Sequence, residues 1–413
     1  MSSAAPAEVQ AAAEDQDSIA AILRARWDGI KSGDVGSLPV IIGIVAIGLF
    51  FYNKQHLFFS AVNFQNLIGQ MAGVTVIAIG VVFVLLIGEI DLSIGYVSGL
   101  AGVVVAELQL AGSGHQYPGL VAIAAAIAAG AAIGALQGSV IALIGVPSFV
   151  VTLAGLLIWQ GVILQALGVQ GVIGIQDKQI NDVANYVLSP NTGWAVAIIF
   201  TVALAAAAFG SYFSRLRAGL PTGNVLFTTV RVVFFGGLAF AAVDVCNNAR
   251  PRPGVPLVGL IILFVVVLGG YIASRTTFGR HVYAVGGSAE AARRAGINVK
   301  LIRILVFMIS GAMAALGGVI LASRLNGVDL NAGGGTLLLD SISAAVIGGV
   351  SLFGGRGRVI GALFGGLIIG MVANGIDLLG YSDAIKLITT GIILLAAVTL
   401  DTVLRRRQAA AGR

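Results

Sequence analysis

The sequence predicts an all-α, polytopic membrane protein with about 12 transmembrane helices, and three properties lead to this fold class. Of its 413 residues, 58% are hydrophobic and only 10% are charged, whereas soluble domains carry about 25% charged residues. The mean hydropathy is +0.99, and apolar runs continue almost from end to end. A helical span needs roughly 20 apolar residues, so the chain has room for a dozen. An ordinary soluble enzyme, a disordered protein and a protein with a single membrane anchor are excluded.

Residues 1–37 form the only stretch with a soluble composition. An acidic, Ala-rich start is followed by Ile19, Ile22, Leu23 and Ile30 at helical spacing, with basic residues between them. This pattern predicts a short interfacial helix in a cytoplasmic N-terminal segment. An unstructured basic arm fits the same residues equally well.

Apolar runs predict the spans of a transmembrane domain over residues 38–403. They cover residues 38–53, 66–88, 93–110, 118–145, 147–168, 194–213, 226–246, 256–274, 301–322, 335–352, 357–378 and 383–403. The third run is short, and the seventh carries Arg231 and Asp244 near its ends, so the expected number is about ten to twelve. The fourth run is long enough to tilt or break. Residues 169–193 form a polar external excursion with weak helical periodicity.

Basic residues set the predicted orientation. With the N-terminus inside, 18 of the 24 lysines and arginines fall on the cytoplasmic side. Cytoplasmic loops carry such an excess, which predicts that both termini are cytoplasmic and that residues 404–413 form a cytoplasmic tail. The net charge of +6 is then explained by these loops, and no nucleic-acid partner is expected.

One internal echo suggests an inverted repeat. Ile133–Gly138 matches Ile360–Gly365 at five of six positions, and an aspartate followed by Ser and Ile precedes each copy, at Asp91 and Asp340. The two copies lie seven spans apart, so they would have opposite orientations, as in transporters that work by alternating access. The alternative is chance similarity in a background rich in Gly, Ala and Leu.

Glycines at spacings of four line single helix faces, as at Gly130, Gly134 and Gly138 and again at Gly361 and Gly365. Lipid provides no hydrophobic force between helices, so small residues favour association by permitting close backbone contact. Such faces serve either static packing or helix sliding during gating.

Motifs for cofactors and catalysis are missing from the sequence. The segment Gly349–Arg356 has the glycine spacing of a phosphate loop but lacks its Lys and Ser/Thr, so it is predicted to be a tight cytoplasmic turn. The one cysteine, Cys246, permits no internal disulfide. His56, His115 and His281 are predicted to lie in separate loops. We therefore expect no metal, no bound cofactor and no enzyme activity.

Charged groups within the apolar region are rare, and Glu89, Asp91 and Ser93 interrupt two apolar runs. Three roles remain open for these acids: hydrogen bonding of broken helix ends, contact with a polar solute or partner, and a proton or ion site. Neutral polar residues on apolar helices could line a path for a hydroxyl-rich solute, or simply form interhelical bonds. Together these candidates for the path are Glu89, Asp91, Ser93, Gln137, Thr152, Gln160 and Asn374.

The longest cytoplasmic loop, residues 275–300, encodes a two-turn helix. Ser288 is a good N-cap, Glu290 can pair with Arg293 or Arg294, and Gly296 supplies a left-handed stop. A helix this short is not stable alone, so it is predicted to dock in a groove of another protein or to rest on its own chain.

Glu290-Ala291-Ala292 with Gly296 resembles the EAA–Gly coupling loop of bacterial ABC-importer permeases. The resemblance implies an ATPase-coupling element made up of Gly286, Gly287, Ser288, Ala289, Glu290, Ala291, Ala292, Arg293, Arg294, Ala295 and Gly296. With Gly88–Gly95 and Phe278–Gly287 added, the chain is similar to the monosaccharide branch, which includes ribose, arabinose and xylose permeases. The resemblance covers about residues 60–400. The extra segment between about residues 213 and 256 is similar to the longer xylose-type permeases.

This resemblance implies a permease of the bacterial inner membrane that imports a monosaccharide by alternating access, with a pentose such as xylose favoured as the substrate. It implies a second permease subunit forming a homodimer, a cytoplasmic ABC ATPase with two nucleotide-binding domains, and an extracytoplasmic sugar-binding protein. ATP hydrolysis would occur only in the partner. An alternative is a self-sufficient proton- or ion-coupled sugar transporter using Glu89 and Asp91. A membrane enzyme is disfavoured, since no catalytic constellation is found.

Overall fold

The computed structural model describes residues 38–110, 116–220 and 224–410. The helix expected within residues 1–37 lies outside them. The chain divides into two compact units: the larger comprises Pro39–Val187 and Pro256–Asp401, and the smaller contains Leu188–Val255. Each is described by itself.

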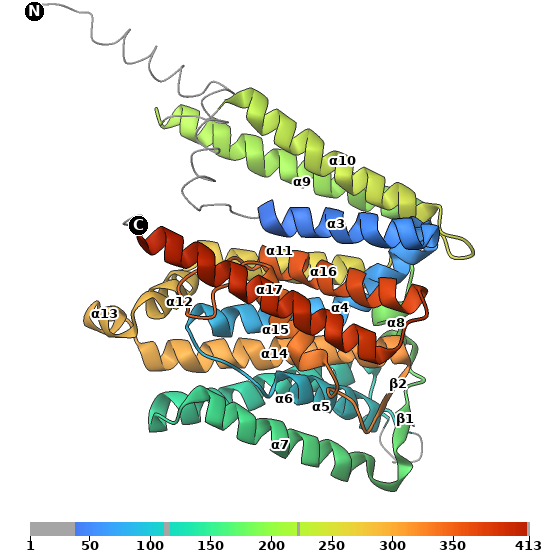
Figure 1. Cartoon of the computed structure of the whole chain (residues 1–413), viewed down its shortest axis with the longest axis vertical. Helices are drawn as coiled ribbons and strands as arrows, with labels where there is room; N and C mark the ends of the chain where they lie inside the picture. Colours follow the sequence, from blue (N-terminus) through green and yellow to red (C-terminus); the bar gives the residue numbers. More distant parts are fainter. Residues whose placement is uncertain (1–37, 111–115, 221–223, 411–413) are drawn as a thin grey trace, which may run out of the picture. The chain divides into compact units, whose positions relative to one another are not determined.

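Helices make up most of both units (Figure 1). The larger unit contains α3 (Leu38–Lys54), α4 (Ala61–Leu86), α5 (Ile94–Glu107), α6 (Gly119–Ser139), α7 (Ser148–Leu167), α8 (Lys178–Asn185), α11 (Leu257–Arg275), α12 (Thr277–Gly287), α13 (Ala289–Arg294), α14 (Val299–Leu325), α15 (Leu337–Ile347) and α16 (Ile360–Leu378), and most of α17 (Asp383–Ala410). The smaller contains α9 (Pro190–Arg217) and α10 (Val225–Asn247). Every predicted span coincides with a helix, which confirms the polytopic helical fold class.

Helices α5 and α15 are much too short for the full crossings predicted there, and α3, with 17 residues, is also shorter than the helices that qualify as candidate spans. Helix α5 has 14 residues and α15 has 11, so they rise only about 21 and 16 Å, short of the roughly 30 Å hydrocarbon core. The tenth predicted span included Gly335 and Gly349, whose positive φ angles of 62° and 88° belong to turns. Hydropathy counts such glycines as part of an apolar run. In the described residues, 8 helices are long and apolar enough to cross a membrane.

Helices α4 and α14 form the centre of the larger unit and run antiparallel. Gly73 of α4 lies against Leu321, whereas Gly80 lies against Ser310 and Met313. Residue numbers therefore rise along one helix as they fall along the other. Both helices contribute heavily to the main hydrophobic cluster, in which Val76 and Phe307 are fully buried.

The glycine faces hold α6 and α16 against these two central helices. Gly130 of α6 lies against Gly311 of α14, and Gly138 lies against Ile304, so α6 and α14 are antiparallel. On the other side, α16 packs antiparallel to α4 through Gly366 and Gly370. It follows that α6 and α16, which carry the sequence echo, run in opposite directions.

Each of the two short helices, α5 and α15, packs against a long helix other than the one that it follows in the chain. Helix α5 follows α4 but packs against α14, and α15 follows α14 but packs against α4. Helix α14 is thus covered by α5 and α6, and α4 is covered by α15 and α16.

A small sheet departs from the all-helical expectation. Strands β1 (Val172–Gly174) and β2 (Gly327–Asp329) pair antiparallel, with Ile173 opposite Val328, and both of these side chains are buried. Helix α8 accounts for the helical periodicity expected in this excursion. Helix α6 continues into a π-helical turn over Val140–Ile144.

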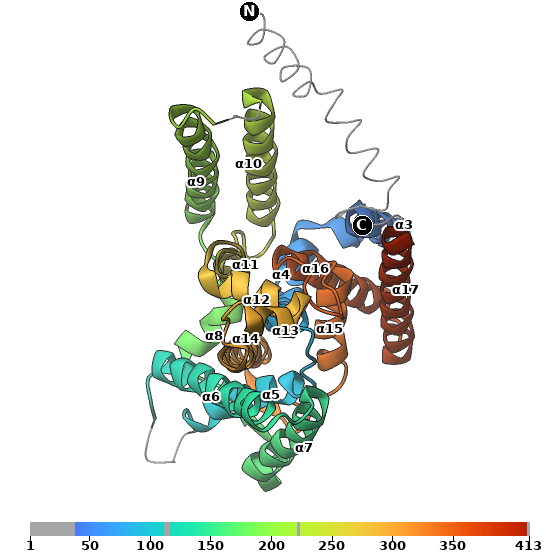
Figure 2. The same ribbon diagram turned by 90° about the vertical axis from the view of Figure 1, so that its left-hand side faces the viewer.

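The smaller unit is a helical hairpin (Figure 2). Trp194 of α9 stacks on Phe240 of α10 with ring centroids 5.9 Å apart, and the backbone N of Leu188 donates to the oxygen of Val255 (2.9 Å), which closes its base. In the larger unit, Leu257 N donates to Tyr186 O (2.9 Å) at the points where the chain leaves and returns.

Candidate functional site

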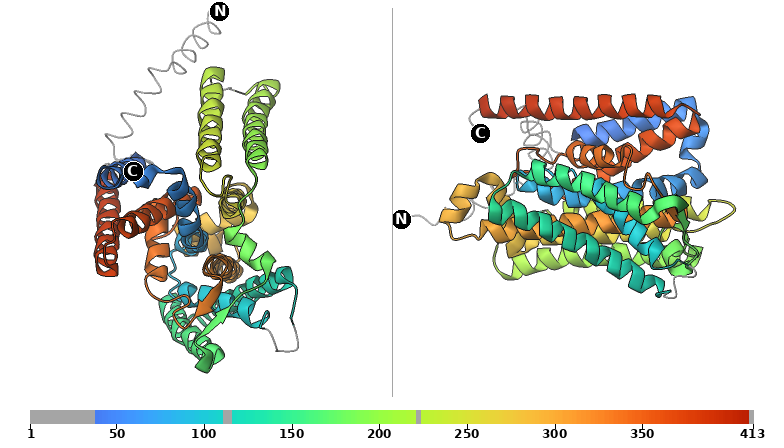
Figure 3. Two further views of the ribbon diagram at one scale, coloured as in Figure 1. Left: turned by 90° about the vertical axis from the view of Figure 1, so that its right-hand side faces the viewer. Right: turned by 90° about the horizontal axis from the view of Figure 1, so that it is seen from below.

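The predicted cytoplasmic loop, residues 275–300, contains two helices rather than one, α12 and α13, at one end of the larger unit (Figures 1 and 3). Thr276 Oγ1 caps α12 by accepting from Gly279 N (3.1 Å), and Ser288 Oγ caps α13 by accepting from Ala291 N (3.2 Å). The N-cap at Ser288 was predicted. Helix α12 was not, because its many glycines and aromatic residues lower its apparent helix propensity. It contains His281, which was expected in a loop.

Helix α13 presents charged groups to its surroundings. Glu290 pairs with Arg293 (3.2 Å) and Arg294 (3.1 Å), and these side chains are 58%, 70% and 80% exposed. Exposed pairs of this kind contribute little to stability, so their charges remain open to a partner. The helix ends at Arg294, and two residues later Gly296 adopts a positive φ of +83°, with Ile297 N donating to Ala292 O (3.0 Å). The predicted pairing and stop are both confirmed.

The end of α12 meets two other segments in a backbone contact, here called the glycine junction: Leu86, Gly88, Gly286, Gly354 and Gly355. A Cβ at Gly286 would collide with the carbonyl oxygen of Leu86 and lie 2.6 Å from Gly355 N. Gly355 N donates to Leu86 O (2.9 Å). The junction joins the coupling helices to the C-terminal end of α4 and to the turn between α15 and α16. Sequence reasoning missed it, although the Gly354–Gly355 pair was a signal for close approach.

A second contact supports the junction. Tyr283 Oη of α12 donates to Gly357 O (2.8 Å). Burial raises the pKa of Tyr283, so the hydroxyl stays protonated as a donor. The predicted turn at Gly349–Arg356 is present, closed by Ser351 N donating to Arg356 O (2.9 Å).

The acids between α4 and α5 sit in an unwound segment, as predicted, and both have partners within the chain. Arg303 Nη2 donates to Glu89 Oε1 (3.1 Å). Asp91 Oδ1 accepts from the backbone N (3.0 Å) and Oγ (2.7 Å) of Ser93, and its Oδ2 accepts from Ser310 Oγ (2.9 Å). Among the three roles left open, these bonds favour the stabilisation of broken helix ends.

Some of the neutral candidates for the path adjoin this break. Ser93 Oγ lies 3.0 Å from Gln137 Oε1, and the buried Gln137 Nε2 has no hydrogen-bond partner. Thr152 Oγ1 donates to Ser148 O (2.8 Å) and lies 3.4 Å from Ile90 O. Gln160 is half-buried on α7.

Asn374 belongs to a different contact. Its Nδ2 donates to Asn63 Oδ1 (2.8 Å), and Asn63 Nδ2 donates to Asn374 Oδ1 (2.7 Å). This reciprocal amide pair joins α16 to α4. The seven predicted path residues therefore do not form one cluster, and their role in a path stays a prediction. Within the described ranges, no group of three His, Cys, Asp or Glu residues is placed to hold a metal ion.

Comparison with known proteins identifies the family. Residues 63–398 match a family described as the permease component of a branched-chain amino acid transport system. The chain is 34% identical over 384 residues to the xylose transport system permease protein XylH of Escherichia coli, covering 92% of this chain and 95% of that protein. The XylH protein of Haemophilus influenzae is 34% identical over 385 residues.

A ribose import permease, RbsC of Escherichia coli, is 33% identical over 344 residues, covering 83% of this chain and 87% of that protein. No solved structure gives a significant match. The apolar helices and these relatives place the chain in the bacterial inner membrane as a multi-pass protein. The chain belongs to this permease family, in the group of ABC sugar-importer permeases that are similar to the xylose and ribose proteins.

Proposed function

We propose that this chain forms the membrane pathway of an ATP-driven importer for a pentose, with xylose as the first substrate to test. The similarity to XylH extends over 92% of the chain, further than the 83% covered by RbsC. We further propose that the chain pairs with a second copy, that a cytoplasmic ATPase docks on α13, and that an extracytoplasmic binding protein delivers the sugar. In this arrangement the chain itself binds no nucleotide or other cofactor, and both of its termini are cytoplasmic.

The observation that carries the coupling proposal is the pairing of an exposed α13 with a rigid glycine junction. Charged groups of Glu290, Arg293 and Arg294 remain available to a partner. Immediately before them, Gly286 is in backbone contact with Leu86 and Gly355. A force applied to α13 would therefore reach the ends of α4 and of the α15–α16 turn through contacts that have no flexible side chain to absorb it.

The antiparallel arrangement of α6 and α16 supports alternating access. The α4–α5–α6 and α14–α15–α16 groups exchange their short helices, and each contains a helix break. Inverted repeats of this kind allow one group to rock against the other around a central site. The proton-coupled alternative gains no support from Glu89 or Asp91, since both carboxylates are held by partners within the chain.

Glu290→Lys tests the coupling proposal. The substitution replaces the ion pairs with repulsion among cations, so we expect sugar uptake to fall at least tenfold while membrane insertion stays normal. Uptake of radiolabelled xylose into proteoliposomes containing the permease, its ATPase and the binding protein measures the effect. Asp383→Lys in α17 is the matched control, because Asp383 is also exposed. Unchanged uptake with Glu290→Lys, or proton-driven uptake by the permease alone, would contradict the proposal.

A further inference from the structure

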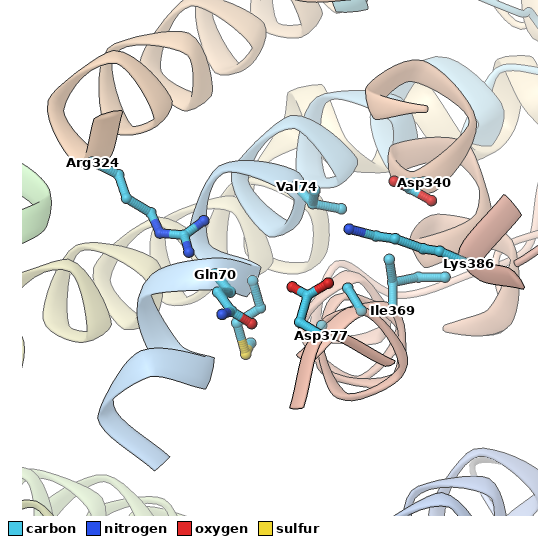
Figure 4. Close-up of a pocket in the computed structure, with 10 residues that line it drawn as sticks. Gln70, Val74, Arg324, Asp340, Ile369, Asp377 and Lys386 are labelled. Atoms are coloured by element: carbon cyan, nitrogen blue, oxygen red, sulfur yellow. The ribbon is translucent and has the colours of Figure 1, made fainter. Parts of the chain in front are cut away.

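A polar pocket lies in the larger unit at the far end of α14 from the coupling helices (Figure 4). Its volume is about 130 Å³. Helix α14 has 27 residues and so extends about 40 Å, which separates the pocket from α13 by roughly the thickness of a membrane. The lining residues come from α4, α14, α15, α16 and α17, and the polar ones are Gln70, Arg324, Asp340, Asp377 and Lys386.

The charges in this pocket balance but are not paired in contact. Two carboxylates face two cations, and Figure 4 shows Lys386 reaching between Asp340 and Asp377. Among the ion pairs within 4.0 Å in the described ranges, none joins these groups. Gln70 Oε1 is buried and has no hydrogen-bond partner. Several strong donors and acceptors therefore converge on a space that no protein group fills.

The polar residues that line the pocket differ in how deeply they are buried. Asp340 is buried, with 8% of its surface exposed, and its Oδ2 accepts from Thr336 Oγ1 (2.7 Å). Gln70 and Lys386 are half-buried, whereas Arg324 and Asp377 are exposed. A solute entering past Arg324 and Asp377 would reach Asp340 at the base.

These features match a neutral solute with many hydroxyl groups. Each hydroxyl both donates and accepts, so it can bond to a carboxylate, a guanidinium, an ammonium or an amide oxygen. The balanced charge gives no net attraction to a free cation or anion. Val74, Ile369 and Ala373 add apolar surface that suits the C–H faces of a sugar ring.

We infer that this pocket is a monosaccharide-binding site at the extracytoplasmic end of the chain. Its sidedness rests on the proposed function, which puts α13 in the cytoplasm. The site combines α4 from the first helix group with α14, α15 and α16 from the second. Relative motion of the two groups would therefore open or close it.

Cysteine protection tests the site directly. Because the chain has one cysteine, a C246A background allows Ala373→Cys to report from the pocket wall and Ala384→Cys, at an exposed position of α17, to serve as the control. Intact cells are treated from outside with a membrane-impermeant thiol reagent, with and without D-xylose or D-ribose. We expect sugar to slow labelling at position 373 at least fivefold and to leave position 384 unchanged. Protection by sodium chloride alone, or no protection by either sugar, would overturn the inference.

Charge-neutralising variants provide the second measurement. D340N and K386M should remove the protection by sugar in the Ala373→Cys chain and raise the KM for uptake, whereas D383N should change neither. If cells carrying the unmodified chain import no sugar but the thiol placed at position 373 is still protected, the proposed import function fails and the site stands. If uptake is normal in D340N and K386M, the site is refuted and the import function stands.

Discussion

Helix α9 of the hairpin and helix α4 of the larger unit are both apolar enough to cross a membrane, yet their surroundings differ completely. In their most apolar windows, 78% of α4 is buried but only 6% of α9. The same contrast holds for α14 at 56% and α10 at 11%. Apolar composition therefore does not decide which helices form the interior of this protein.

The positions of glycine account for much of the difference. A Cβ at Gly134 would collide with the carbonyl oxygen of Phe307, whereas one at Gly210 of α9 would meet nothing within 4 Å. In a bilayer, an apolar side chain is as stable facing lipid as facing another helix, so close backbone approach and dispersion hold helices together. Glycine faces therefore mark the closest helix contacts within the larger unit, such as that of α6 with α14.

The largest expected effect comes from filling a glycine face. Gly134→Leu forces α6 away from α14, so we expect most of the protein to be lost as aggregate or degraded chain. Gly210→Leu is the matched control and should leave the yield within about twofold. Size-exclusion chromatography of detergent extracts measures both. Equal yields of folded protein from the two variants would show that the close approach at Gly134 is not needed for folding.

Next in size is a change confined to the glycine junction. Gly286→Ala places a methyl group against Leu86 O, so we expect at least a tenfold fall in ATP-driven uptake with a smaller fall in thermal stability. Its neighbour Gly287 meets nothing within 4 Å, which makes Gly287→Ala the control with near-normal uptake. If both variants transport alike, the junction does not transmit motion.

The buried amide pair gives a moderate effect. Asn374→Leu removes the donor to the buried Asn63 Oδ1, whereas Asn63 Nδ2 keeps its bond to Phe58 O. The unsatisfied oxygen costs about 1–3 kcal/mol, and the double variant Asn63→Leu/Asn374→Leu should recover part of this loss. The Thr201 hydroxyl of α9 donates to Ala197 O within its own helix (2.8 Å), so Thr201→Val should change stability by less than about 0.5 kcal/mol. Denaturant unfolding in mixed micelles measures the free energy of unfolding of the three variants. Additive losses in the double variant would show that the pair is not coupled.

The smallest effect on the larger unit is expected from removing the hairpin. Tyr186 and Leu257 are already hydrogen-bonded where the chain leaves and returns. Replacing residues 189–254 with a short Gly/Ser linker should therefore leave the remaining unit folded, with its thermal midpoint lowered by only a few degrees. Thermal unfolding followed by intrinsic fluorescence checks this. Collapse of the shortened chain would show that the hairpin supports the core.

The sequence was most informative where local chemistry controls structure. Ser288, Glu290 and Gly296 define a capped helix and its stop through residues a few positions apart, and the structure has these contacts. The break at Glu89 and Asp91 was also predictable, since charges are costly within an apolar run. Their partners, Arg303 and Ser310, lie more than 200 residues away and were not.

By itself, the sequence determined the membrane setting, the positions of most of the long helices and the form of the coupling helix, because hydropathy, capping and backbone freedom are properties of neighbouring residues. Tertiary structure decided which apolar helices are interior, which short helices fall short of a full crossing, how Gly286 meets Leu86, and how α4, α15 and α17 bring Gln70, Asp340 and Lys386 to one pocket. These depend on contacts between distant segments, and one chain's pattern of apolar residues gives no information about which faces will meet.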